Sequence, residues 1–430
     1  MVLSALRAHV KPLLLGLLVK GLYFIWLLWE NTHFQGMQGI ALWDADSWEY
    51  IDTVESWLSG HGWDPDHRMP GYALIYLLFR SWLPMYAARS VLVLVHLLVA
   101  TIATYALART VSTVCGRARL FWLFYAALLF TSFHALIEVF LVNESLTTSM
   151  LIFHWTSYAA YQRSEDRRWL LASGAFIMAA IFLRPIYGPL LLAVPSIELF
   201  RKGRPLLRRF ALAMLFCSPF IVADGIWTTR NHALYGGFHP LTNHGPFNPR
   251  FSHTAYYALI RYLEAYGGHC YWWNPVSDIR WYGYEPDAGG GRDKPIPGVK
   301  EPPPDAITSV CTRDSLIALA ELNRYARRPE RTQHERDSIY DVMRATTERY
   351  RAVYEREHPF HYQVVSRLRL LKHETIVSGT ETLFRRPFDQ LNFLEKLYKY
   401  SQSLWFWWAQ VLGIGFGCVL IGHIRRDATA

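Results

Sequence analysis

PLLLGLLVKGLYFIWLLWE, at residues 12–30, sets the architecture of this chain, because it is apolar over about the 20 residues that a helix needs to cross a bilayer. The one charge in its interior is Lys20. Of the 430 residues, 52% are hydrophobic and 15% are aromatic, more than a soluble enzyme of this length usually carries. We therefore expect a mainly α-helical, polytopic membrane protein.

Further apolar runs predict about eight transmembrane helices in total. After the first, they lie near residues 88–108, 119–140, 145–162, 168–184, 186–200, 209–228 and 403–424. Pro185 separates two of these runs and must break the helix there, since proline has no backbone N–H and clashes with the preceding turn. The first run lacks a small-residue cleavage pattern and exceeds signal-peptide length, so we interpret it as a retained span.

Basic residues indicate the orientation. Lys and Arg gather in every second connection between the predicted spans. Because short cytoplasmic loops are enriched in these residues, both termini are predicted to be cytoplasmic. The net charge of +9 then reflects topology, and we expect no nucleic-acid partner.

Three regions are predicted to lie outside the membrane: 31–87, a turn at 141–145 and a long segment near 229–402. The chain thus divides into a transmembrane module (1–231), a soluble extracytoplasmic insertion (232–402) and a final span with a cytoplasmic tail (403–430). The insertion contains a Gly/Pro-rich tract at 283–305 and ends in an interfacial helix at 388–400. Cys270 and Cys311 share it, and a disulfide or two free thiols are both open.

The first outer loop carries two carboxylates among aromatic side chains, in WDADSWEY at 43–50. A helix over 46–58 would lie along the membrane and place Asp46, Glu49 and Tyr50 on one face. An external Asp46 is suited to take the proton of an acceptor hydroxyl. With Asp44 it is alternatively suited to hold a divalent cation. A third interpretation is that Asp46 and Glu49 form a capping box at the helix start.

Four further charged residues are candidates for a site at the same membrane surface. Arg68, in RMPGY at 68–72, and Arg184 and Arg230 are suited to bind phosphate, because a guanidinium presents a planar fork of donors. Each is alternatively a headgroup-facing arginine. Glu144 begins the turn after Asn143, where the helix dipole alone favours an acid. Lys20 either snorkels to the interface or forms a buried pair.

Taken in order, these motifs resemble the GT-C superfamily of membrane glycosyltransferases, which includes protein O-mannosyltransferases and the transferases that move aminoarabinose onto lipid A. The resemblance covers about residues 10–245. It is carried by motif order rather than by any one motif: D-S-x-x-Y (46–50), R-x-P-G-Y (68–72), N-E-S-L (143–146), L-R-P (183–185) and W-x-x-R-N (227–231).

The resemblance implies a polyprenyl-phosphate sugar donor and inverting transfer to an acceptor hydroxyl outside the membrane. Asp46 takes the catalytic position, with Glu144 as the second-loop acid and Asp44 as an assistant or metal ligand. By the same resemblance, the donor phosphate would be bound by Arg68, Arg184 and Arg230, and the substrate would be contacted by Tyr50, Tyr72 and Asn231. A bacterial inner-membrane protein with a periplasmic site is expected, its acceptor a glycan, lipid or protein. A transporter or flippase of a lipid-linked sugar is the alternative.

Overall fold

A computed structural model describes residues 2–30, 39–42, 46–63, 68–131, 137–235, 238, 240–241, 251–268, 270, 278–282, 304–326, 328, 330–376 and 390–429. These residues are mainly helical, and among them the only β pairing is an isolated parallel bridge between Leu42 and Phe140. The chain divides into two compact units, residues 1–243 with 378–430, and residues 244–377. Each unit is described by itself.

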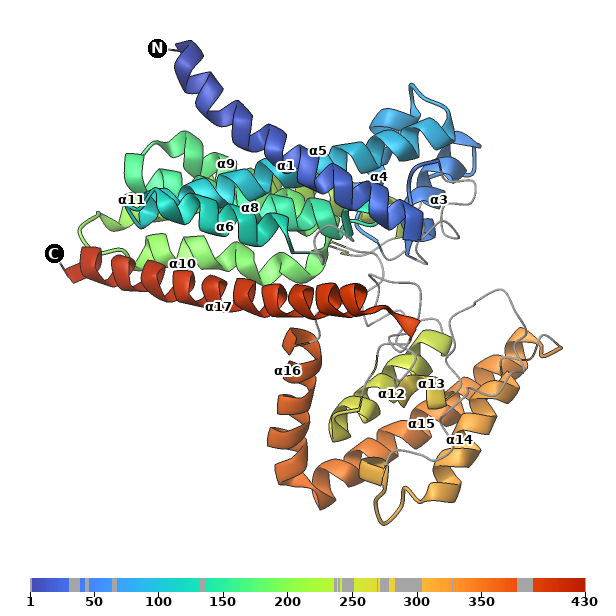
Figure 1. Ribbon diagram of the computed structural model, residues 1–430. Helices are drawn as coiled ribbons and strands as arrows, with labels where there is room; N and C mark the ends of the chain where they lie inside the picture. The colour runs from blue at the N-terminus through green and yellow to red at the C-terminus, as the bar shows by residue number, and fades with distance from the viewer. Residues whose placement is uncertain are drawn as a thin grey trace. The chain divides into compact units, whose positions relative to one another are not determined.

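Three helices of the first unit are long and apolar enough to cross a membrane (Figure 1). They belong to α1 (Val2–Glu30), α5 (Met85–Val114) and α11 (Leu206–Tyr235). They coincide with the predicted spans at 12–30, 88–108 and 209–228. The other predicted crossings remain predictions.

Among the helices between these three, α8 (Glu144–Ser164) and α9 (Arg167–Leu183) closely match the predicted ranges 145–162 and 168–184, whereas α6 (Arg119–Leu129) is much shorter than the predicted range 119–140. α6 ends well before residue 140, and its 11 residues rise about 16 Å, roughly half of a hydrocarbon core. It stops where Phe130 leaves helical geometry and the Thr131 hydroxyl donates to the Ala127 carbonyl.

The break at Pro185 is confirmed. α9 ends at Leu183, Arg184 is extended, and a 3₁₀ helix (Pro185–Leu192) precedes α10 (Ala193–Phe200). The last predicted elements differ, because the interfacial helix and the final span form one continuous helix, α17 (Phe393–Thr429).

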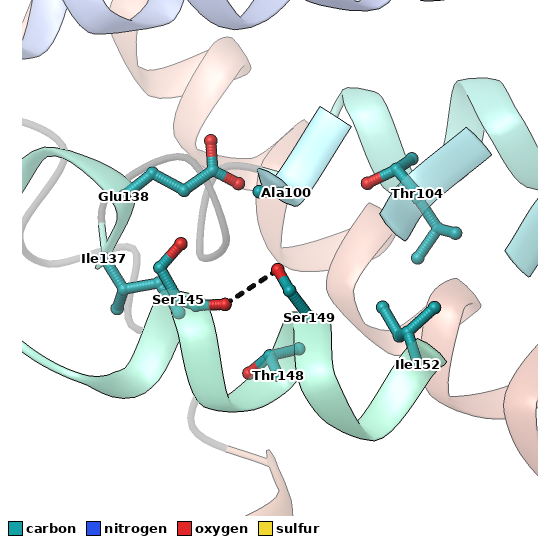
Figure 2. Close-up of a pocket in the computed structure, with 9 residues that line it drawn as sticks. Ala100, Thr104, Ile137, Glu138, Ser145, Thr148, Ser149 and Ile152 are labelled. Carbon is teal, nitrogen blue, oxygen red and sulfur yellow. Dashed lines mark hydrogen bonds between the residues drawn. The ribbon is translucent and has the colours of Figure 1, made fainter. Parts of the chain in front are cut away.

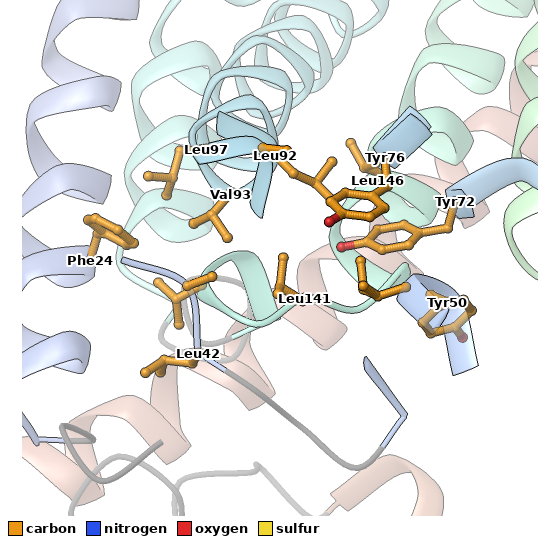
Figure 3. Packing of buried hydrophobic residues seen from close by; sticks show 14 of the residues in the cluster. Phe24, Leu42, Tyr50, Tyr72, Tyr76, Leu92, Val93, Leu97, Leu141 and Leu146 are labelled. Atoms are coloured by element: carbon orange, nitrogen blue, oxygen red, sulfur yellow. The ribbon is translucent and has the colours of Figure 1, made fainter. Parts of the chain in front are cut away.

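The segment predicted as the first outer loop holds two short helices, α3 (Ser47–Leu58) and α4 (Gly71–Arg80). α3 matches the predicted helix and buries Tyr50, Ile51 and Val54 in the core of the unit. Each such side chain stabilises the fold by roughly 1.5–3 kcal/mol through burial. In Figure 3 the rings of Tyr50 and Tyr72 lie side by side in this cluster. The packing fixes the end of the loop that carries Asp46.

The second unit falls inside the range predicted for the insertion and has its own core. It contains α12 (Phe251–Tyr266), α13 (Asp278–Trp281), α14 (Arg313–Ala326), α15 (Gln333–Glu357) and α16 (Ser366–Ile376). Cys270 and Cys311 are free thiols, and the Cys311 sulfur lies 2.8 Å from the Tyr262 hydroxyl. Residues 283–303 of the Gly/Pro-rich tract lie outside the described residues.

Candidate functional site

The candidate site is assembled from three connections that are far apart in the sequence. The segment before α3 meets the turn before α8 through backbone hydrogen bonds: Leu42 N–H donates to Val139 O at 3.0 Å, and Leu141 N–H donates to Leu42 O at 3.1 Å. The His96 ring contacts the Glu138 carbonyl at 3.3 Å. Because a carbonyl only accepts, Nδ1 of His96 carries the proton. The segment before α3 and the turn before α8 are thereby held together.

The end of α9 is joined to both connections. The Asn143 side-chain amide donates to the Leu183 carbonyl. At Gly71, which begins α4, an added Cβ would lie 2.6 Å from the carbonyl oxygen of Phe182. Only glycine permits this approach without a shift of the backbone. Gly71 of the RMPGY motif therefore brings the first outer loop against the residues that precede Arg184.

Asp46 lies directly before α3, but its side chain makes no capping hydrogen bond. The capping-box interpretation is therefore wrong for Asp46. Its Oδ2 instead lies 3.2 Å from Nη2 of Arg68. The same guanidinium pairs with Glu49 and donates to the Tyr50 hydroxyl at 3.2 Å. Arg68 thus organises the three polar residues of this helix face, as their predicted spacing indicated.

Glu144 and Arg184 form the second ion pair of the site, with 3.0 Å between Oε1 and Nη1. The other carboxylate oxygen, Oε2, is buried and accepts no hydrogen bond within the described part of the chain. Burial raises the pKa of Glu144, and the adjacent Arg184 opposes that rise. A carboxylate with one unsatisfied oxygen is suited to accept a donor from a bound molecule.

Tyr50 connects the two ion pairs. Burial raises its pKa, and the charges of Arg68, Glu144, Asp46 and Arg184 all act on its hydroxyl. Both pairs therefore lie close enough to this phenol to influence its ionisation. The structure thus brings together five of the predicted site residues, which come from four separate motifs.

Tyr72 packs against Tyr50 and bonds to His96. Its ring centre lies 5.0 Å from that of Tyr50, and its hydroxyl lies 3.3 Å from Nε2 of His96. Since Nδ1 of His96 is protonated, Nε2 accepts from Tyr72. Tyr72 is fully buried, so the geometry gives it a packing role. Its predicted contact with substrate remains a prediction.

Arg230 and Asn231 occupy a different setting near the end of α11. Arg230 donates to the Trp63 carbonyl and, at 2.9 Å, to the Asn231 side chain. Its guanidinium also lies 4.7 Å from the ring centre of Trp227. These contacts tie α11 to the first outer loop. The donor-phosphate role of Arg230 and the substrate role of Asn231 remain predictions.

The hypothesis that Asp44 and Asp46 hold a divalent cation remains untested, because Asp44 lies outside the described residues. Within the part of the chain that the structure describes, no group of three or more His, Cys, Asp or Glu side chains is arranged to hold a metal ion.

Sequence reasoning missed the partner of Lys20. This lysine does not snorkel: it pairs with Glu138, and both side chains are almost completely buried. The signal was present in the sequence, because Glu138 is an acid within a predicted span and an apolar environment favours pairing of opposite charges.

No family model, no curated protein and no solved structure matches this chain.

Proposed function

We propose that this protein is a membrane glycosyltransferase that moves a sugar from a polyprenyl-phosphate donor to an acceptor hydroxyl. One observation supports the proposal above the others: Asp46, Arg68, Tyr50, Glu144 and Arg184, from three distant connections, act on one another electrostatically. Glycosyl transfer from a phosphate needs a proton acceptor and cations at one place.

The proposed step uses these groups as follows. An acceptor oxygen attacks the anomeric carbon and forms the new C–O bond, while the bond from that carbon to the phosphate oxygen breaks with its electron pair. The acceptor proton passes to the Asp46 carboxylate. The leaving polyprenyl phosphate carries the negative charge, which Arg184 and Arg68 stabilise. Attack opposite to the leaving group inverts the anomeric centre.

Both arginines that are proposed to bind the donor phosphate already have partners within the protein. Arg68 is held by Asp46, Glu49 and Tyr50, and Arg184 is held by Glu144. A phosphate that binds either arginine must displace or share a carboxylate. Donor binding would then release Asp46 or Glu144 for the acceptor, so that the base becomes available only when the leaving group is in place.

The proposal extends to the surroundings of the site. We place it in the bacterial inner membrane with the site facing the periplasm and both termini in the cytoplasm. The second unit, residues 244–377, is proposed to select the acceptor, since large external segments commonly carry binding function.

The test is release of polyprenyl phosphate by the purified full-length protein in lipid vesicles, with a panel of polyprenyl-phosphate sugars and candidate acceptors. Acceptor-dependent release that is lost in Asp46→Asn is expected. Movement of the labelled donor across the bilayer with no release would instead establish the alternative, a flippase. If no donor gives either release or movement, both the transferase proposal and the flippase alternative are contradicted.

A further inference from the structure

A second polar centre is buried in the first unit. Lys20 of α1 and Glu138 meet in an ion pair whose side chains are 3% and 2% exposed. Glu138 Oε1 accepts from the ammonium, whereas Oε2 is buried and has no hydrogen-bond partner within the described residues. Burying a carboxylate oxygen without a hydrogen-bond partner costs free energy, and native structures rarely leave such an atom without a partner.

A cavity adjoins this carboxylate. It lies among α5, α8 and the segment that carries Glu138, and it has room for about one water molecule. Its lining contains several hydroxyl-bearing residues, namely Thr104, Ser145, Thr148 and Ser149. Figure 2 shows Glu138 and Ser145 at one end of the cavity, and Thr104 and Ile152 at the other.

Ser145 supplies a second unsatisfied group in the same cavity. Its side chain is buried, and its Oγ has no hydrogen-bond partner among the described residues. The neighbouring Ser149 differs, because its hydroxyl donates to the Ser145 carbonyl at 2.9 Å. Two residues that line this cavity, Glu138 and Ser145, therefore each carry a buried polar atom without a partner among the described residues: one a pure acceptor, the other both donor and acceptor.

We propose that this cavity binds one ordered water molecule, which donates to Glu138 Oε2 and bonds to Ser145 Oγ. Water fits because buried waters occupy polar cavities of this size with two to four partners. A cation fits less well, since Lys20 already neutralises Glu138 and a further positive charge would be unpaired. The water would join the buried ion pair to Ser145, the residue that follows Glu144 in the chain. It would thereby steady the turn that presents Glu144, whatever reaction the protein performs.

The sign of one substitution tests the proposal. If the water is present, Ser145→Ala removes one of its partners, and the melting midpoint of the purified full-length protein should fall, by on the order of 2 °C. If the cavity is dry, the same substitution removes an unsatisfied hydroxyl, and the midpoint should rise. Ser173→Ala is the matched reference, because the buried Ser173 hydroxyl bonds to His154 at 2.8 Å and its loss lowers the midpoint in either case.

Two further measurements separate the alternatives. A high-resolution density map should show a peak within hydrogen-bond distance of both Glu138 Oε2 and Ser145 Oγ, and a vacant cavity would overturn the proposal. Melting in sodium chloride should equal melting in choline chloride at the same ionic strength. A stabilisation specific to sodium, present in the wild-type protein and absent from Ser145→Ala, would assign the cavity to a cation and would also overturn it.

Discussion

Arg184 and Glu144 face each other across 3.0 Å at the same end of two antiparallel helices. Glu144 opens α8, where the helix dipole favours an acid, and Arg184 follows the last residue of α9, where it favours a base. Each charge of the pair therefore interacts favourably with the dipole of the helix end beside it, without any ligand. This arrangement explains how an acid and an arginine are held together at the end of these two helices.

Replacing Asp46 tests the proposed proton acceptor. Asp46→Asn keeps the shape of the side chain and removes its basicity, so turnover should fall by about 10²–10⁴-fold while the protein stays folded. Polyprenyl phosphate release is the measurement, with the melting midpoint as the test of folding. Asp52→Asn, at an exposed position of the same helix, should retain turnover. A well-folded Asp46→Asn protein with near-normal turnover would remove Asp46 from the mechanism.

Substitutions of Arg184 and Arg230 test whether each arginine binds the donor phosphate. Arg184→Lys keeps the charge but loses the planar fork, so donor KM should rise several-fold, and Arg184→Gln should raise it further. Arg230 is engaged with Trp63 and Asn231, so it is replaced alone and together with Arg184 to detect redundancy. Unchanged donor binding in the double Gln variant would exclude the phosphate role for both.

Gly71 tests the close approach of the first outer loop to α9. In Gly71→Ala the new Cβ would lie 2.6 Å from the Phe182 oxygen, so the backbones must separate. Overpacking of this kind typically costs about 1–3 kcal/mol. Both the melting midpoint and turnover should drop. Gly188→Ala is the matched control, because nothing lies within 4 Å of a Cβ there. Equal behaviour of the two variants would show that the contact has no importance.

The pH dependence of stability follows from Glu144. Burial raises the pKa of this carboxyl above its ordinary value of 4.5, so the folded state binds the proton more tightly than the unfolded state. Its contribution to the free energy of unfolding is complete below that ordinary value and is lost as pH rises through the raised pKa. The melting midpoint of the wild type relative to Glu144→Gln should therefore fall as the pH is raised from below 4.5 through the raised pKa. A difference that rises with pH would contradict the assignment.

The buried ion pair gives the largest expected effect on stability. Lys20→Met leaves Glu138 as an uncompensated buried acid, and breaking a buried pair costs about 3–5 kcal/mol. The double variant Lys20→Met/Glu138→Met removes both charges and should recover much of that loss. Thermal melting of all three proteins measures it. If Lys20→Met alone melts like the wild type, the pair contributes little and Lys20 has another orientation.

The local elements followed from the sequence because their causes are local. Uninterrupted apolar length predicted α1, α5 and α11, and the missing N–H of Pro185 predicted the break after α9. Spacing within one helix also placed Asp46, Glu49 and Tyr50 on a common face, where Arg68 engages all three. The final helix was less well predicted, because a charged interfacial segment and an apolar span share the same helical periodicity and merge into α17.

Which residues contact each other across the fold was decided only by the tertiary structure. No local pattern states that Lys20 meets Glu138, that Glu144 meets Arg184, or that Gly71 rests on Phe182. Those contacts depend on how α4, α8 and α9 pack, and packing is decided by the shape of many side chains at once. The capping interpretation of Asp46 failed for the same reason: Arg68, which lies later in the same loop, competes with the backbone for its carboxylate. Charge type and spacing nominated the residues, and only the packed fold selected their partners.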